Sequence, residues 1–167
     1  FKTWLYFDTL LNEENHYLIP DNYQTNREEK EDIKTSPTDI AMSLTSIISA
    51  HELEFIDNRK AIHMIEKVIT SIEKLEKWNG HLYNWYNIKT LETLRPRFVS
   101  TVDSGNFIAC LYVAREFFEE IIGNKDYVRL NKKYYDTRID ELIKINNKLI
   151  EDVDFTVLYD TDRNLFS

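Results

Sequence analysis

The sequence of 167 residues is long enough to form one domain with a hydrophobic core. Its 29 acidic residues against 21 Lys and Arg give a net charge of −8. That balance argues against a general nucleic-acid-binding protein, which needs clustered positive charge, and it suits a neutral ligand better. The single cysteine, Cys110, lies in an apolar run and favours a buried thiol in a reducing compartment. No apolar run of membrane-spanning length is present, and residues 1–11 are too polar for a signal peptide.

The first third of the chain predicts one short helix, a long connection and an uncharged helix. Residues 1–11 have helical apolar spacing. In the connection that follows, residues 18–24 should pack, whereas the charged stretch 25–34 should be solvated. Ser36 as N-cap, Pro37 at the first helical position and Asp39 three residues after the cap then predict a helix start with a capping box. Residues 40–50 carry no charge, so we expect other helices to surround them.

The rest of the chain repeats this order. Residues 58–77 predict a helix with one solvated face, because they carry an apolar stripe formed by Ala61, Ile65, Val68, Ile69, Ile72 and Leu75. A second long connection, residues 78–103, leads into a helix that we expect to open at Ser104 and to stop at Gly123 and Asn124. A half-exposed helix follows over residues 127–153, with apolar positions at Tyr135, Ile139, Leu142, Ile145, Leu149 and Val153. Residues 155–166 predict a short hairpin.

Uncharged and half-exposed helices therefore alternate, and each long connection enters an uncharged helix. This order predicts an all-α fold in which helical hairpins form part of an α/α toroid, with a short C-terminal β-hairpin. The connections 12–35, 78–103 and 155 onward should then share one face. About two and a half hairpins are too few to close a ring, so we expect residues 1–167 to be a single partial domain. Exposed inner-helix surfaces should then cause self-association.

The connection from residue 78 combines aromatic rings with polar groups. Trp78, Tyr83, Trp85 and Tyr86 alternate with His81 and several amides, and Arg95 and Arg97 follow. Flat rings beside amides, an imidazole and arginines suit a carbohydrate, whose C–H faces stack and whose hydroxyls need fixed partners. The alternative for the rings is an aromatic plug that seals one end of a helix bundle. The alternative for the arginines is that they hold carboxylates of the protein.

The sequence does not identify a catalytic pair. Glycosidic chemistry usually needs two carboxyl groups that flank the bond. Asp39 and Asp103 are the candidates for this end of the fold, but Asp39 fits a helix cap, and Asp103 or Ser104 would cap the helix that follows. For Asp21, which follows a proline, the alternative is a turn alone. No pair of histidines has metal-binding spacing and no second cysteine exists, so we predict neither a metal site nor a cofactor.

Several ordered motifs carry a family resemblance, namely residues 20–24, 35–40, 80–86, 96–106 and 155–160. Together they resemble the glucoamylase-like middle region of cyclic β-1,2-glucan synthases. The resemblance implies a glycoside-hydrolase-like toroid that cyclises β-1,2-glucan by transglycosylation, within a large multi-domain enzyme attached to the inner membrane. Its partners would be a glucose oligosaccharide and the remainder of the parent polypeptide, on the cytoplasmic side.

The resemblance also implies roles for individual positions. The acid and base glutamates are expected beyond Ser167, so the chain would be inactive alone. With His81, which we add from the aromatic segment, the expected sugar-contacting and loop-ordering residues are Asp21, Asn22, Gln24, His81, Tyr83, Asn84, Trp85, Tyr86, Arg97, Asp103 and Asn106.

Two other hypotheses remain open at this stage. One is a helical interaction module whose aromatic loop binds a peptide or a partner subunit. The other is an intact small enzyme in which Asp39 and Asp103 face each other across a cleft, roughly 5 to 10 Å apart.

Overall fold

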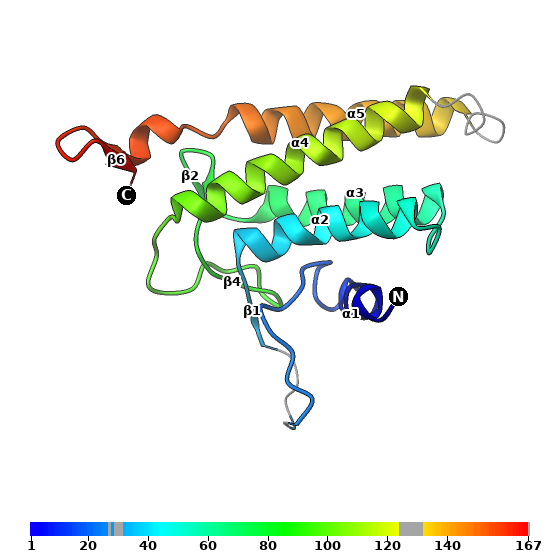
Figure 1. The fold of residues 1–167 in the computed structure, drawn as a ribbon, viewed down its shortest axis with the longest axis horizontal. Helices are drawn as coiled ribbons and strands as arrows, with labels where there is room; N and C mark the ends of the chain where they lie inside the picture. Colours follow the sequence, from blue (N-terminus) through cyan, green and yellow to red (C-terminus); the bar gives the residue numbers. More distant parts are fainter. Residues whose placement is uncertain (27, 29–31, 124–131, 167) are drawn as a thin grey trace.

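The computed structural model describes residues 1–26, 28, 32–123 and 132–166, and the side chains of residues 132–135 lie outside the described set. Over these residues the fold is mainly helical (Figure 1). The helices are α1 (Lys2–Leu10), α2 (Pro37–Glu52), α3 (Asn58–Lys74), α4 (Thr101–Gly123) and α5 (Lys132–Glu151).

The helices pack as two hairpins arranged in two layers. Helix α2 packs against α4, and α3 and α5 lie against them on the other side, where they also contact each other (Figure 1). The core between the layers is built from branched and aromatic side chains that are fully buried, among them Ile40, Leu44, Ile65, Ile69, Phe107, Leu111, Phe118 and Ile139. The expected arrangement of inner and outer helices is therefore confirmed.

Local sequence signals explain where α2 and α3 begin. The Ser36 hydroxyl accepts a hydrogen bond from the Asp39 N–H, and the Asp39 carboxylate accepts one from the Ser36 N–H, which completes the expected capping box. Asp57 caps α3 through the Lys60 N–H. The stripe predicted for α3 is buried along its whole length, and α3 ends at Lys74 because the chain turns into a strand.

In the part of the chain that the structure describes, three short antiparallel strand pairs organise the connections. Strand β1 (Lys34–Thr35) pairs with β4 (Tyr86–Asn87), and so joins the two long connections. Strands β2 (Lys77–Trp78) and β3 (His81–Leu82) form a tight hairpin. The last pair, β5 (Tyr159–Asp160) and β6 (Leu165–Phe166), confirms the expected C-terminal hairpin, although a 3-10 helix, η2 (Phe155–Leu158), replaces the start of its first strand.

The start of α4 differs from the prediction. The helix begins at Thr101, not at Ser104, because the Ser100 hydroxyl accepts the Asp103 N–H and acts as the cap. Asp103 and Ser104 therefore lie inside the first turn and do not cap it. In the next predicted helix, residues 127–131 and the side chain of Tyr135 fall outside the described residues, as does Asn124.

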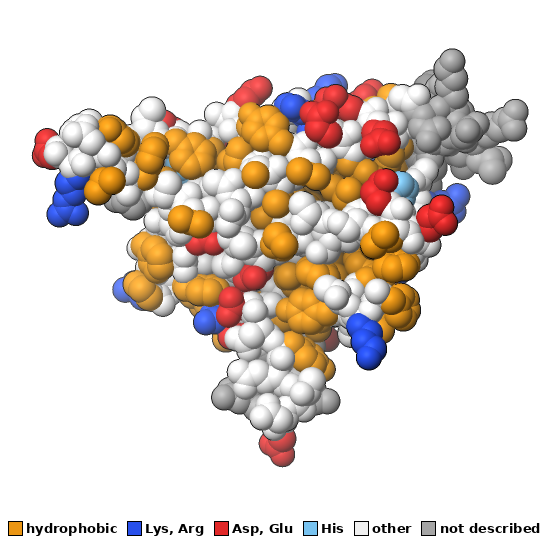
Figure 2. All heavy atoms as spheres, in the orientation of Figure 1, with side chains coloured by type: hydrophobic (Ala, Val, Ile, Leu, Met, Phe, Trp, Pro, Cys, Tyr) orange, Lys and Arg blue, Asp and Glu red, His pale blue; other side chains and the backbone are white. Residues whose placement is uncertain are grey.

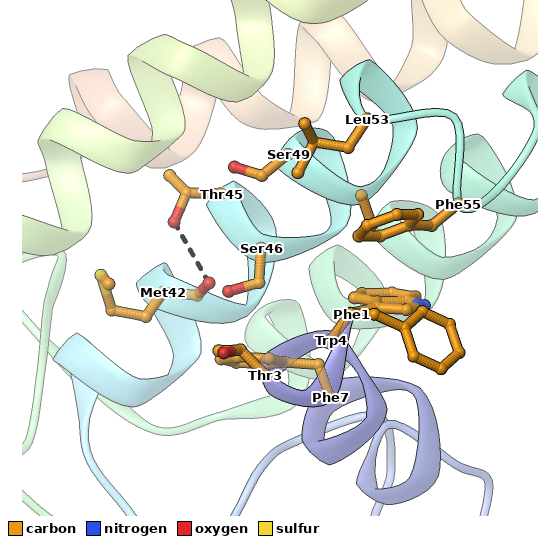
Figure 3. Close-up of a pocket in the computed structure, with 11 residues that line it drawn as sticks. Phe1, Thr3, Trp4, Phe7, Met42, Thr45, Ser46, Ser49, Leu53 and Phe55 are labelled. Atoms are coloured by element: carbon orange, nitrogen blue, oxygen red, sulfur yellow. Dashed lines mark hydrogen bonds between the residues drawn. The ribbon is translucent and has the colours of Figure 1, made fainter.

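The uncharged helices are not surrounded by other helices on every side, and they leave the exposed inner-helix surface that we expected of a partial toroid. Met42 on α2 is 50% exposed, and Tyr112 and Val113 on α4 are each 44% exposed. Figure 2 shows this face, where mainly uncharged and hydrophobic side chains lie over α2 and α4. Next to it, α1, α2 and the turn after α2 line an open pocket of about 360 Å³, whose walls are mainly aromatic and aliphatic with several Ser and Thr hydroxyls (Figure 3). Among the described residues no helix is both long and apolar enough to cross a membrane.

Candidate functional site

The starts of α2 and α4 lie side by side and are joined by hydrogen bonds. The Thr38 hydroxyl, in the first turn of α2, donates to Asp103 Oδ1 in the first turn of α4. Asn106 Nδ2, one turn further along α4, donates to Thr38 Oγ1 at 3.1 Å. Because β1 runs directly into α2 and pairs with β4, both long connections end where α2 and α4 begin. We call this end of the helices the rim. The expectation that the long connections share one face is therefore met.

The third connection, which follows α5, is joined to the rim by His81 of the second connection. The His81 side chain is buried, with 1% exposed. Its Nε2 lies 2.9 Å from the carbonyl oxygen of Asp154, so Nε2 carries the proton and donates. In the neutral ring Nδ1 is then an acceptor, and it takes the Ser104 hydroxyl at 2.9 Å. His81 thus ties the second connection to α4 and to the segment after α5, and both of its nitrogens are engaged inside the protein.

Trp85 is held beside the first turn of α4 by Asn84, which is 8% exposed. The surrounding donors and acceptors fix the orientation of the Asn84 amide. In that orientation its Oδ1 accepts from Trp85 Nε1 at 2.5 Å, and its Nδ2 donates to Asp103 Oδ2 at 3.3 Å. The indole is partly exposed, so its edge is fixed while part of its surface remains accessible.

A lysine lies over the ring of Trp85 and connects it to acidic groups. Lys34 Nζ is 4.3 Å from the centre of the indole, and 3.9 Å from Asp21 Oδ2 and from Asp32 Oδ2. The amide of Asn22 donates to Asp32 Oδ2 at 3.1 Å. These contacts pack the first long connection, residues 12–35, against the second one, residues 78–103, which we call the aromatic connection.

The contacts form one continuous set, which we call the rim network. Gln24 completes it, since its Nε2 donates to Asn22 Oδ1 at 3.3 Å. The rim network consists of Asp21, Asn22, Gln24, Asp32, Lys34, Thr38, Asn84, Trp85, Asp103 and Asn106.

Asp39 lies at the rim but serves the start of α2. Its Oδ2 accepts the Ser36 N–H at 2.9 Å and the Ser36 hydroxyl at 2.7 Å. Burial raises the pKa of the Asp39 carboxyl above its usual value, and the nearby carboxylates of Asp21 and Asp103 raise it further, while the bonds from Ser36 lower it. The two candidate catalytic carboxylates, Asp39 and Asp103, are thus both hydrogen-bonded within the protein.

The remaining predicted residues lie on the flank of the rim. Tyr86 is fully buried, and its hydroxyl donates to the Glu76 carbonyl at 2.6 Å and accepts the Tyr83 N–H at 2.7 Å. Burial raises the pKa of this phenol well above its usual value. Arg97 pairs with Glu76 at 3.0 Å and lies over the Tyr83 ring at 5.7 Å. Arg97 therefore holds a carboxylate of the protein, and Tyr86 belongs to the buried core.

Three members of the rim network were not singled out from the sequence, namely Asp32, Lys34 and Thr38. The first two belong to a stretch that we expected to be solvated, yet their side chains are only 26% and 35% exposed. Thr38 was visible as part of a motif, but nothing in its spacing indicated that it would bond to a residue 65 positions away. Among the described residues, no three His, Cys, Asp or Glu side chains gather in a way that could hold a metal ion.

Comparisons with known proteins agree with these observations. No protein-family model matches the chain. The cyclic β-(1,2)-glucan synthase NdvB of Rhizobium meliloti is 38% identical over 133 residues, which cover 75% of this chain and 5% of NdvB.

Solved structures extend the match to the fold. A glucoamylase-like protein from Bacteroides fragilis superimposes with a TM-score of 0.77 at 16% identity, over 99% of this chain and 37% of that one. An endo-β-1,2-glucanase from Chitinophaga pinensis gives 0.75 at 16% identity, over 94% of this chain and 35% of that one. The chain therefore spans about a third of these folds and a small part of NdvB. The resemblance to the cyclic β-1,2-glucan synthases is confirmed over three quarters of the chain, on a glucoamylase-like α/α fold.

Proposed function

We propose that the chain contributes part of the glucan-binding cleft of an enzyme of the cyclic β-1,2-glucan synthase type, in the glycoside-hydrolase-like domain that cyclises the glucan. The observation that carries this proposal is the rim network. It sets the partly exposed ring of Trp85 among carboxylates, amides and a hydroxyl that come from both long connections and from the first turns of α2 and α4.

The chemistry of this rim suits a neutral oligosaccharide. An aromatic face stacks against the C–H groups of a sugar ring, while carboxylate and amide groups bind hydroxyls in fixed directions. Asp21 and Asn106 are exposed, and Asn22 and Gln24 are half-buried, so their polar atoms can reach a ligand. His81, Asn84 and Tyr86 are buried and would act by holding the others in place. Tyr83 and Arg97 would border the rim.

The choice of β-1,2-linked glucose rests on the relatives. NdvB is named for its cyclic β-1,2-glucan product, and the Chitinophaga glucanase was solved with sophorotriose and glucose. We place the acid and base of the reaction outside this chain, because Asp39 and Asp103 are engaged in holding the two helix starts. The chain would thus bind glucan but lack activity alone. The free thiol of Cys110 suits the cytoplasmic side of the membrane to which the parent enzyme would be attached.

Titration with β-1,2-gluco-oligosaccharides tests this proposal through intrinsic tryptophan fluorescence. We expect a saturable change in the parent chain that is lost in Trp85→Ala. Trp78→Ala is the matched control, because Trp78 lies on the same connection and is 41% exposed but contacts His81 instead of the rim network. Saturation that survives in Trp85→Ala, in a variant with unchanged circular dichroism, would contradict the assignment of the cleft.

A further inference from the structure

The ammonium group of Lys34 occupies a surface that a sugar would need. At 4.3 Å from the centre of the Trp85 indole, Nζ is in contact with one face of the ring. The indole Nε1–H donates a hydrogen bond to Asn84. The ring therefore cannot rotate to expose the face under Lys34 without breaking this hydrogen bond. A sugar that stacks on this face must displace Lys34.

A position for the displaced ammonium exists beside the ring. Nζ is 3.9 Å from one oxygen of Asp21 and 3.9 Å from one oxygen of Asp32, about 1 Å longer than a close charge-assisted hydrogen bond. Both carboxylates also accept the Asn22 amide, which lies 3.4 Å from Asp21 Oδ2 and 3.1 Å from Asp32 Oδ2. The Asp32 Oδ1 accepts the Lys34 N–H at 3.2 Å. A small rotation of the lysine stem therefore exchanges the contact with the ring for a closer ion pair.

From this geometry we infer that Lys34 is a specificity-determining residue of the site, which covers the stacking face of Trp85 and withdraws to Asp21 and Asp32 when a sugar binds. The inference rests on the proposed function, because it presumes that Trp85 stacks on glucan. The contact that the sugar must replace is a partly exposed cation–π contact, so its removal should tighten glucan binding roughly two- to fivefold. Ligands that offer no better contact to the ring would be excluded by the same lysine.

Lys34→Met keeps most of the aliphatic stem and removes the charge. The matched control is Lys60→Met, which removes the same charge from a half-exposed ion pair with Asp8 at the far end of the fold. Both are made in a Trp78→Phe background, so that Trp85 is the main tryptophan open to solvent; Trp4 is 7% exposed. Lys34→Arg keeps a cation over the ring, so it should not share the tighter binding of Lys34→Met.

Two measurements separate this inference from the proposed function. Acrylamide quenching needs no sugar, and it should rise in Lys34→Ala, which removes the stem that covers the ring, but not in Lys60→Ala. Fluorescence titration with β-1,2-gluco-oligosaccharides should then show tighter binding in Lys34→Met alone. Unchanged quenching, or increased quenching with weaker binding, would overturn the inference. If neither the parent chain nor any variant binds glucan, the proposed function fails, and so does the displacement of Lys34 by sugar. The quenching measurement still decides whether Lys34 covers the ring.

Discussion

The close approach at Gly80 gives a stability prediction whose size follows from the coordinates. Gly80 has a φ of +80°, and a Cβ at this position would lie 2.0 Å from the carbonyl oxygen of Asp152 and 2.6 Å from the Val153 nitrogen. These are backbone atoms that cannot rotate away. The left-handed conformation costs a non-glycine residue about 1–2 kcal/mol, and overpacking of this kind costs about 1–3 kcal/mol. Gly80→Ala should therefore lower the free energy of unfolding by about 2–5 kcal/mol.

Urea unfolding followed by circular dichroism measures this change, and thermal unfolding should show a Tm lower by roughly 4–20 °C for a chain of this size. Gly105→Ala is the matched control. Gly105 lies inside α4, and beyond the backbone of its own helix no atom lies within 4 Å of the added Cβ, so alanine should stabilise the helix by about 0.5–1 kcal/mol. If Gly80→Ala unfolds within about 0.5 kcal/mol of the parent, the segment after α5 is not held rigidly against the aromatic connection.

Three further predictions concern the rim and the exposed face. Burial raises the pKa of Asp39, so the folded state keeps the proton of this carboxyl to higher pH than the unfolded state does. The stability that Asp39 contributes is therefore lost as pH rises from about 4 through the raised pKa. The loss of unfolding free energy in Asp39→Asn, measured by urea unfolding, should accordingly be smaller at pH 7 than at pH 4. Tyr86→Phe should cost about 2–3 kcal/mol in the same assay, because the Glu76 carbonyl and the Tyr83 N–H both lose a buried partner. The uncovered face of α2 and α4 should cause concentration-dependent self-association in light scattering, and Tyr112→Lys should reduce it.

Each of these three predictions has a result that would contradict it. A penalty for Asp39→Asn that grows with pH would mean that the capping bonds outweigh burial and depress the pKa. A Tyr86→Phe variant as stable as the parent would mean that water replaces the lost hydroxyl. A parent chain that stays monomeric over a wide concentration range would mean that the exposed apolar side chains do not form an association surface.

The features predicted well from sequence are those fixed by near neighbours. Ser36, Pro37 and Asp39 interact within one turn, so their spacing alone specified the capping box. The apolar stripe of α3 is likewise a property of helical periodicity. Ser100 was missed because Asp103 and Ser104 are equally suitable capping residues by type. In the fold, Ser100 accepts the Asp103 N–H, while the Asp103 carboxylate accepts the Thr38 hydroxyl of α2.

The site was predicted in outline but not in its roles. Trp85 and Tyr86 look equivalent as neighbours in an aromatic run. The pairing of β4 with β1 turns Tyr86 into the core, while Trp85 is left partly exposed. From composition we expected Lys34 to lie in a solvated charged stretch. No local pattern indicates that the ring of Trp85, more than fifty positions later, lies beneath its ammonium group. Long-range contacts of this kind decide which polar residues line the rim.

Hydrogen–deuterium exchange with and without a β-1,2-gluco-oligosaccharide tests most directly whether the converging connections bind glucan together. We expect bound ligand to slow exchange jointly in residues 20–24, 34–39, 81–87 and 101–106, and to leave exchange unchanged in the turn at residues 53–58, at the other end of the helices. Protection limited to one of these segments, or centred on the 53–58 turn, would contradict this expectation.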